Sequence, residues 1–198
     1  MAVECGAAAV GLVSEMPSGP GVISEELIAE VAARVPPGVA TFLLTCRQDA
    51  ASIIEQQRHC RVNTIQLCDR VPREAYDELR AGLPGVSLVQ VVHVGGEESL
   101  DEALSVAPHV DALLLDSGNQ GLAVKELGGT GRTHDWRVSR RIVEASPAPV
   151  FLAGGLRPEN VAAAVSAVGP FGLDVCSGVR TDGRLDAEKL KRFFAHTV

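Results

Sequence analysis

The run Leu113-Leu114-Leu115-Asp116-Ser117 decides how this chain folds, and the segment 127–136, Leu-Gly-Gly-Thr-Gly-Arg-Thr-His-Asp-Trp, follows it closely. An apolar run that ends in a carboxylate, before a glycine-rich loop and a helix beginning near Asp135, is typical of a buried parallel strand. Asp116 then lies at the C-terminal tip of that strand, where barrel folds carry their chemistry. Taken alone, Asp116 is explained more simply as a turn cap, so the pattern has to recur before it indicates a site.

Apolar runs rich in small and β-branched residues recur along the chain with the length of ordinary strands. The predicted strands cover 8–14, 40–46, 64–68, 87–94, 112–117, 149–155 and 173–179. Amphipathic segments with helical spacing separate them, at 24–33, 50–58, 73–81, 97–106, 135–144, 158–168 and 187–194. This alternation predicts an α/β protein of successive βα units, which form either a closed barrel or an open doubly wound sheet.

Polar residues stand at the C-terminal ends of these predicted strands. They are Cys46, Cys68-Asp69, His93, Asp116-Ser117, Gly154-Gly155 and Ser177-Gly178. A barrel gathers the C-terminal strand ends around one mouth, so the repeated pattern favours a single site there.

Composition narrows the class of protein further. The chain has 198 residues, 46% of them hydrophobic and 4% aromatic, and no linker or low-complexity tract divides it, so we expect one domain over 1–198 with an aliphatic core. A net charge of -7 without a basic run makes nucleic acid an unexpected partner. No run approaches the length of a membrane span and no signal peptide is evident, so we expect a cytoplasmic protein without a membrane partner.

Cysteine usage indicates neither disulfides nor a metal centre. The five cysteines, Cys5, Cys46, Cys60, Cys68 and Cys176, are odd in number and not closely paired. We therefore expect free thiols and predict neither a metal nor another cofactor.

Two glycine-bearing segments near the C-terminus predict a phosphate site. Gly154-Gly155 and Ser177-Gly178 follow consecutive predicted strands, and glycines let backbone N–H groups approach an anion closely. Barrel enzymes often bind phosphate at their last two strands, so a phosphorylated small molecule is the expected ligand. Gly155→Val and Gly178→Val are expected to weaken sugar-phosphate binding without unfolding the protein.

These blocks, in this order, resemble the phosphoribosylanthranilate isomerases of tryptophan biosynthesis. The similar segments are 6–13, 65–67, 114–117, 128–136, 153–161 and 174–179. The resemblance implies a (β/α)8 TIM-type barrel, and we expect this chain to lack the first strand. It also implies an intramolecular oxidoreductase that performs an Amadori rearrangement, with Asp116 as the general acid and Gly128, Gly129 and Gly131 in a substrate loop.

The sequence departs from the family pattern at three places. The family's base is a cysteine in a Lys-Ile-Cys-Gly-Ile motif on the first strand, and Cys5 does not match that motif. The family's carboxylate-binding arginine lies in the loop after the second strand, where this chain has Gly21. The family's Gln-Leu-His-Gly reads Gln66-Leu67-Cys68-Asp69 here.

A replacement base is therefore part of the prediction. The candidates at strand tips and in the loop are Cys46, Cys68, His93 and His134, and we favour Cys68 because it replaces a histidine that faces the mouth. Its pKa would have to fall from about 8.5 for much thiolate to exist at neutral pH.

Three readings of the function remain open from the sequence. We favour an isomerase of a phosphoribosyl substrate. The alternatives are a catalytically silent or divergent phosphate-binding barrel that has lost the base and the arginine, and an enzyme for another acid/base reaction on a phosphorylated metabolite. The gap at the first strand is compatible with a misplaced start codon, a swapped strand or a seven-stranded form. It leaves sheet edges at 8–14 and 173–179, which we expect a homodimer or a terminal segment to cover.

Overall fold

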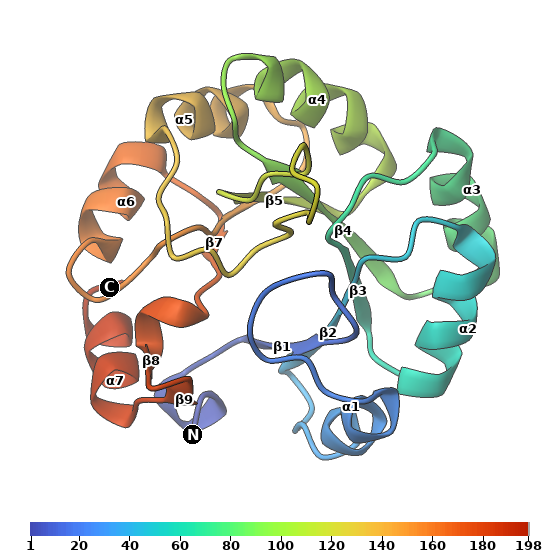
Figure 1. Ribbon diagram of the computed structural model, residues 1–198, viewed down its shortest axis with the longest axis horizontal. Coiled ribbons are helices and arrows are strands. Elements are labelled where there is room, and N and C mark those ends of the chain that lie inside the picture. The colour runs from blue at the N-terminus through green and yellow to red at the C-terminus, as the bar shows by residue number, and fades with distance from the viewer. Residues whose placement is uncertain (198) are drawn as a thin grey trace.

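Seven parallel strands curl into an incomplete barrel in the structure, a computed structural model that describes residues 1–197 (Figure 1). The strands follow one another in chain order from β1 to β7. They are β1 Ala9–Val13, β2 Ala40–Thr45, β3 Thr64–Leu67, β4 Ser87–His93, β5 Ala112–Asp116, β6 Val150–Leu152 and β7 Gly172–Leu173. This confirms the predicted α/β barrel class and the predicted order of the strands.

The helices form an outer ring around the curled sheet (Figure 1). They are α1 Glu25–Ala32, α2 Ala50–Cys60, α3 Arg73–Gly82, α4 Glu98–Val106, α5 Trp136–Ala145, α6 Val161–Val168 and α7 Ala187–Ala195, with 3-10 turns η1 Val3–Cys5, η2 Ala107–His109 and η3 Ser177–Val179. Ser24 caps α1 by accepting a hydrogen bond from the Leu27 amide, and Asp135 caps α5 in the same way through the Arg137 amide. The side-chain oxygens thus satisfy amides that have no partner within the helix.

The core has two layers because successive residues of a strand face opposite sides of the sheet. Leu113 and Leu115 of β5 are fully buried between the sheet and the helix ring, where Ile142 of α5 also packs. Leu114 instead faces the barrel interior, in the cluster that contains Val91. The same alternation turns Asp116, two residues after Leu114, toward the interior at the end of the strand.

The last two strands are shorter than predicted. The run 173–179 was expected to be one strand, yet β7 ends at Leu173 and residues 177–179 form the turn η3. A Cβ atom on Gly178 would overlap the Leu156 carbonyl oxygen, so this segment packs tightly against the loop after β6 instead of extending the sheet. A two-stranded hairpin, β8 Arg180–Thr181 and β9 Arg184–Leu185, then leads into α7.

β1 and β7 are the two ends of the sheet, and within residues 1–197 no strand pairs between them. The chain itself covers part of this gap. The Ile23 amide donates to the Val13 carbonyl (3.0 Å) on the free side of β1, and η1 packs on α7. Across the residues that the structure describes, no helix is long and apolar enough to cross a membrane.

Candidate active site

Asp116 is a buried carboxylate at the mouth of the barrel. Its Oδ1 accepts a hydrogen bond from the Ser117 amide at 2.6 Å, while its Oδ2 has no partner among the described residues. The position that a Cβ atom of Gly128 would take lies 2.8 Å from Oδ2. Glycine is therefore required where the loop passes over the acid, since any side chain there would displace a ligand or the carboxylate.

The predicted substrate loop, with Gly128, Gly129 and Gly131, belongs to the segment 117–135 between β5 and α5, which lies across the mouth. Gly128 lies over Asp116, and a Cβ atom on Gly131 would lie 3.6 Å from the Ser177 hydroxyl. Ser117 and Thr130 share a hydroxyl hydrogen bond of 2.8 Å. The structure thus brings Gly128 beside Asp116 and Gly131 beside Ser177, whereas Gly129 packs on Pro20 of the loop after β1.

A second carboxylate, Asp174, faces the same mouth and was not predicted as a site residue. Leu115, Leu152 and Leu173 are aligned across β5, β6 and β7. Asp116 and Asp174, the residues that follow Leu115 and Leu173, therefore lie at the same level of the barrel with β6 between them. Alternate strands contribute to one layer of a barrel interior, which accounts for their shared direction. Although part of Asp174 remains in contact with solvent, desolvation of its carboxyl and the charge of Asp116 raise its pKa to about 6.

This raised pKa makes a prediction for stability. A carboxyl that is easier to protonate in the folded state stabilises the protein fully below its unfolded pKa of about 4, and that contribution is lost as the pH rises through about 6. Asp174→Asn should therefore raise the melting temperature at pH 8 by an amount equivalent to about 1 kcal/mol, a value reduced for the solvent contact. Thermal unfolding at pH 8 and pH 4 tests this, since the gain should vanish at pH 4.

The predicted phosphate residues lie together beside these carboxylates. Gly154 (φ +82°) and Gly155 (φ +61°) adopt left-handed conformations, and the Asn160 side chain donates to the Gly155 carbonyl (3.0 Å) to shape the turn. In residues 1–197 the amides of Gly154, Gly155, Ser177 and Gly178 donate to no backbone or side-chain acceptor. Several unpaired amides at one place are what an anion requires.

The glycine substitutions proposed from the sequence will not separate binding from folding. A Cβ atom on Gly155 would lie 2.6 Å from the Arg132 carbonyl carbon, and one on Gly178 would overlap the Leu156 carbonyl oxygen. Both neighbours are backbone atoms, so relieving either overlap requires a shift of the main chain. The expectation that Gly155→Val and Gly178→Val leave the fold intact is therefore wrong on steric grounds.

Cys68 lies near Asp116, but its pKa is not lowered as a thiolate base would require. The thiol is fully buried, and burial together with the charges of Asp116 and Asp174 raises its pKa instead of lowering it. Cys46 donates its thiol to the Glu15 carbonyl (3.1 Å), and burial raises its pKa as well. All five cysteines are free thiols, as predicted.

The two histidines differ in what they offer. His93 Nε2 lies 2.9 Å from the Cys68 carbonyl, and its Nδ1 is buried against Gly118. His134 Nε2 lies 2.7 Å from the Ser139 hydroxyl, and its buried Nδ1 has no partner. The point where a Cβ atom of Gly154 would lie is 3.1 Å from both His134 Nδ1 and Asp116 Oδ1, so the two groups lie close together at the mouth.

The lowered pKa of His134 favours the neutral form of its imidazole ring. Burial lowers its pKa, against the opposing effects of the Asp116 and Asp135 charges. A neutral imidazole whose free nitrogen is directed at the site is a suitable proton acceptor.

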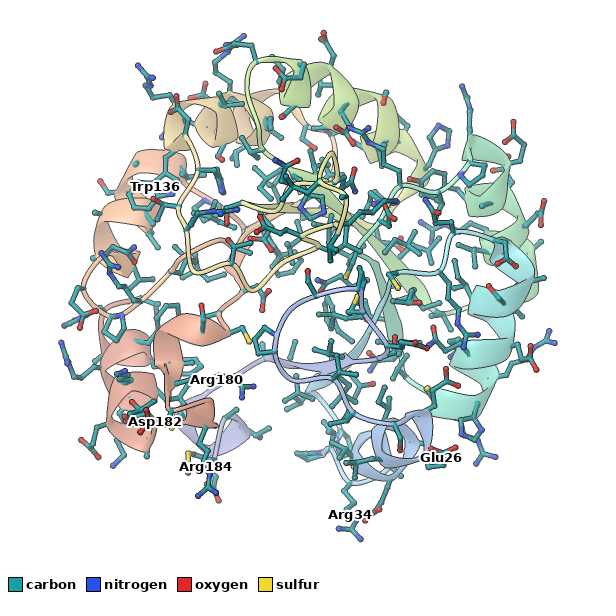
Figure 2. All side chains as sticks on the ribbon, viewed as in Figure 1. Glu26, Arg34, Trp136, Arg180, Asp182 and Arg184 are labelled. Atoms are coloured by element: carbon teal, nitrogen blue, oxygen red, sulfur yellow. The ribbon has the colours of Figure 1, made fainter. Side chains whose placement is uncertain are left out.

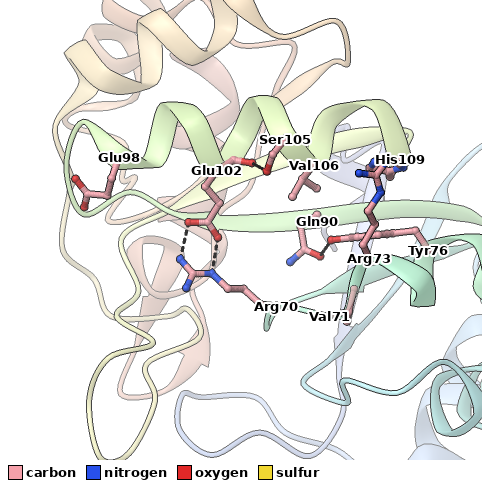
Figure 3. Close-up of a pocket in the computed structure, with 10 residues that line it drawn as sticks. All are labelled: Arg70, Val71, Arg73, Tyr76, Gln90, Glu98, Glu102, Ser105, Val106 and His109. Atoms are coloured by element: carbon pink, nitrogen blue, oxygen red, sulfur yellow. Dashed lines mark hydrogen bonds and ion pairs between the residues drawn. The ribbon is translucent and has the colours of Figure 1, made fainter.

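Two cavities accompany this arrangement. One of about 330 Å³ opens on the β1 to β3 side of the mouth; its lining residues are Glu15, Met16, Pro17, Cys46, Arg47, Gln56, Asp69 and Leu127. A larger one of about 500 Å³ lies between α3 and α4 on the outside of the barrel (Figure 3). There Arg70 is paired with Glu102, and Tyr76 donates to Gln90. This cavity lies away from Asp116 and the predicted phosphate residues, which are at the mouth.

A family model described as N-(5'phosphoribosyl)anthranilate (PRA) isomerase matches residues 2–196. The chain belongs to the phosphoribosylanthranilate isomerase family. Among the members to which it is similar, one named N-(5'-phosphoribosyl)anthranilate isomerase from Methanocella arvoryzae is 34% identical over 98% of this chain and 88% of its own length. One of the same name from Haloferax volcanii is 39% identical over 96% of this chain and 83% of its own length.

Solved structures of the family agree with the fold. The phosphoribosyl anthranilate isomerase of Thermotoga maritima superposes with a TM-score of 0.84 and 28% identity, covering 99% of this chain and 90% of its own. A second structure, with a TM-score of 0.81 and 27% identity over the same shares, holds reduced 1-(o-carboxyphenylamino)-1-deoxyribulose 5-phosphate. The ligand in that structure carries a carboxyphenyl group and a phosphate.

Proposed function

We propose that this protein isomerises N-(5'-phosphoribosyl)anthranilate to the corresponding aminoketose in tryptophan biosynthesis. Family membership supports the reaction, and the observation that supports the site is a buried carboxylate with a free oxygen, Asp116, beside two glycine segments with unpaired amides. The test is a turnover assay of the purified protein with phosphoribosylanthranilate, alongside calorimetry with ribose 5-phosphate. Turnover is expected; phosphate binding without turnover would favour the silent barrel instead.

Asp116 is the proposed general acid. It donates a proton to the ribose ring oxygen as the bond between that oxygen and C1 breaks, and the anthranilate nitrogen lone pair forms an iminium group with C1. The neighbouring Asp174 is proposed to supply protons at the mouth, because desolvation and the charge of Asp116 raise the pKa of the Asp174 carboxyl to about 6. A proton held near neutral pH suits general acid catalysis.

His134 is the proposed general base, in place of Cys68. Its neutral ring accepts the proton of C2, and the electron pair of that C–H bond moves into the bond between C1 and C2 and neutralises the iminium nitrogen. The product of this step is an enolamine with a hydroxyl group on C2. It becomes the aminoketose when C1 takes up a proton from His134 and the C2 hydroxyl returns a proton to Asp116, which restores both groups. The free Nδ1 beside Asp116 is what supports this role.

One pair of variants distinguishes His134 from Cys68 as the general base. Cys68→Ser should leave kcat within about threefold of the parent, because a thiol whose pKa is raised holds its proton at neutral pH. His134→Asn should lower kcat by about a hundredfold, a typical share for general base catalysis. Steady-state kinetics measure both, and the reverse ranking would return the role to Cys68.

Gly154, Gly155, Ser177 and Gly178 are the proposed phosphate site, through their amides and the Ser177 hydroxyl. Gly128, Gly129 and Gly131 are proposed to cover the substrate and exclude water, because their loop lies over Asp116 and reaches Ser177.

The free sheet edges support a homodimer as the proposed assembly, with β1 and β7 at or near the contact. One family structure from Thermotoga maritima is of monomers generated from a dimeric phosphoribosylanthranilate isomerase. Light scattering of the purified chain tests the proposal, and a monomer at micromolar concentration would overturn it.

As a biosynthetic enzyme, the protein is proposed to work in the cytoplasm.

A further inference from the structure

The guanidinium group of Arg180 has one unpaired edge. Arg180 follows η3 directly and begins β8, and its Nη1 donates to the Gly183 carbonyl (2.8 Å) within the hairpin. Its Nε is buried and has no hydrogen-bond partner. Its Nη2 lies 3.7 Å from the point where a Cβ atom of Gly21 would be, with no acceptor recorded for it in residues 1–197. Within residues 1–197 the Nε and Nη2 donors, which lie side by side, thus have no oxygen acceptor. The Cys176 thiol lies near the guanidinium group, which partly offsets the burial that raises the pKa of that thiol.

This edge is the one with which arginine binds a carboxylate through two parallel hydrogen bonds. The protein contains a filled example of the arrangement. Arg70 donates from Nε and Nη2 to the two oxygens of Glu102, each at 2.7 Å. In the described part of the chain, Arg180 has no carboxylate of its own and makes no ion pair. A buried donor without an acceptor is costly, so a ligand that supplies one gains free energy.

The unpaired edge faces the mouth of the barrel. Gly21 belongs to the loop after β1, and the point beside it that Nη2 approaches is also 3.9 Å from Val13, the last residue of that strand. Figure 2 shows Arg180 on the side of the hairpin toward β1, whereas Arg184 of the same hairpin points away from the barrel. Gly21 has no side chain of its own to cover this edge of the guanidinium group.

Three other cations around the mouth are already paired. Arg47 binds Glu25 (2.7 Å), Lys125 binds Asp69 (2.5 Å) and Arg132 binds Glu126. Beside the loop after β1, Arg180 is therefore a cation that makes no ion pair within residues 1–197.

We propose that Arg180 binds the carboxylate of the anthranilate ring through Nε and Nη2, and so helps to set substrate specificity. The inference rests on the proposed function, whose substrate carries one phosphate and one carboxylate. The phosphate has its own site at the amides of Gly154, Gly155 and Gly178. The carboxylate is left for the guanidinium group across the mouth, next to Gly21.

The test compares two ligands with three variants by calorimetry. Ribose 5-phosphate carries the phosphate alone, and reduced 1-(o-carboxyphenylamino)-1-deoxyribulose 5-phosphate carries both anionic groups. Arg180→Met should weaken binding of the carboxyphenyl compound by about thirtyfold and that of ribose 5-phosphate by less than twofold, because only the carboxylate loses its partner. Arg180→Lys should fall between, since an ammonium group cannot form the two parallel bonds. Arg184→Met, in the same hairpin with its side chain exposed, is the control and should change neither.

The outcomes separate this inference from the proposed function. Equal weakening of both ligands would make Arg180 a phosphate ligand, and unchanged binding of both would make it structural; either overturns the inference. Failure of the parent protein to bind the carboxyphenyl compound also overturns it. A parent that binds this compound in an Arg180-dependent way, yet does not turn over phosphoribosylanthranilate, would leave the carboxylate site standing and refute the isomerase.

Discussion

Asp116→Asn is expected to lower kcat by about a thousandfold while ribose 5-phosphate binds as before. The amide has nearly the same shape as the carboxyl group but has no acidic proton for the ribose ring oxygen, and loss of a general acid typically costs about a hundredfold to ten-thousandfold. The Ser117 amide can still donate to the side-chain oxygen, so the mouth should keep its form. Steady-state kinetics and calorimetry on the same preparation measure the two effects.

The control is an aspartate of the same kind that lies away from the mouth. Asp77 is exposed on α3, and Asp77→Asn should leave kcat unchanged. A kcat for Asp116→Asn within tenfold of the parent would show that ring opening does not depend on this acid. Loss of ribose 5-phosphate binding would instead show that the substitution disturbs the neighbouring Gly154 turn.

The βα alternation was predictable from the sequence because it depends on local periodicity. Each predicted strand has a counterpart in the sheet, and the tip at Asp116 lies where the pattern placed it. The error at 173–179 has a tertiary cause. Gly178 packs on the Leu156 carbonyl, and this contact between two loops leaves no periodic trace in the sequence.

Side-chain environments were harder to predict for the same reason. The run Leu173-Asp174 repeats the pattern of Leu115-Asp116, so Asp174 carried a usable signal, but only the strand register shows that the two carboxylates share one level. The burial that raises the pKa of Cys68 comes from three neighbouring strands and is invisible in its local sequence. The approach of Arg180 to Gly21 joins segments separated by most of the chain.

Gly178→Ala should disturb the phosphate site and the fold together. The added Cβ atom would overlap the Leu156 carbonyl oxygen, so either η3 or the loop after β6 has to shift. Overpacking of this kind costs about 1–3 kcal/mol, which for a protein of this size corresponds to a drop of about 5 °C in melting temperature. Because the same shift moves the amides of Ser177 and Gly178, affinity for ribose 5-phosphate should fall at least tenfold.

Two companion variants keep this prediction informative. In Gly95→Ala the nearest atom to the new Cβ is the end of the flexible Glu98 side chain, at 3.3 Å, so both melting temperature and affinity should stay near the parent values. Ser177→Ala removes one hydroxyl without adding an atom, and should weaken ribose 5-phosphate about fivefold at an unchanged melting temperature, as expected for one hydrogen bond. If Gly178→Ala lowers the melting temperature while both it and Ser177→Ala bind ribose 5-phosphate like the parent, then η3 supports the fold and the phosphate binds elsewhere.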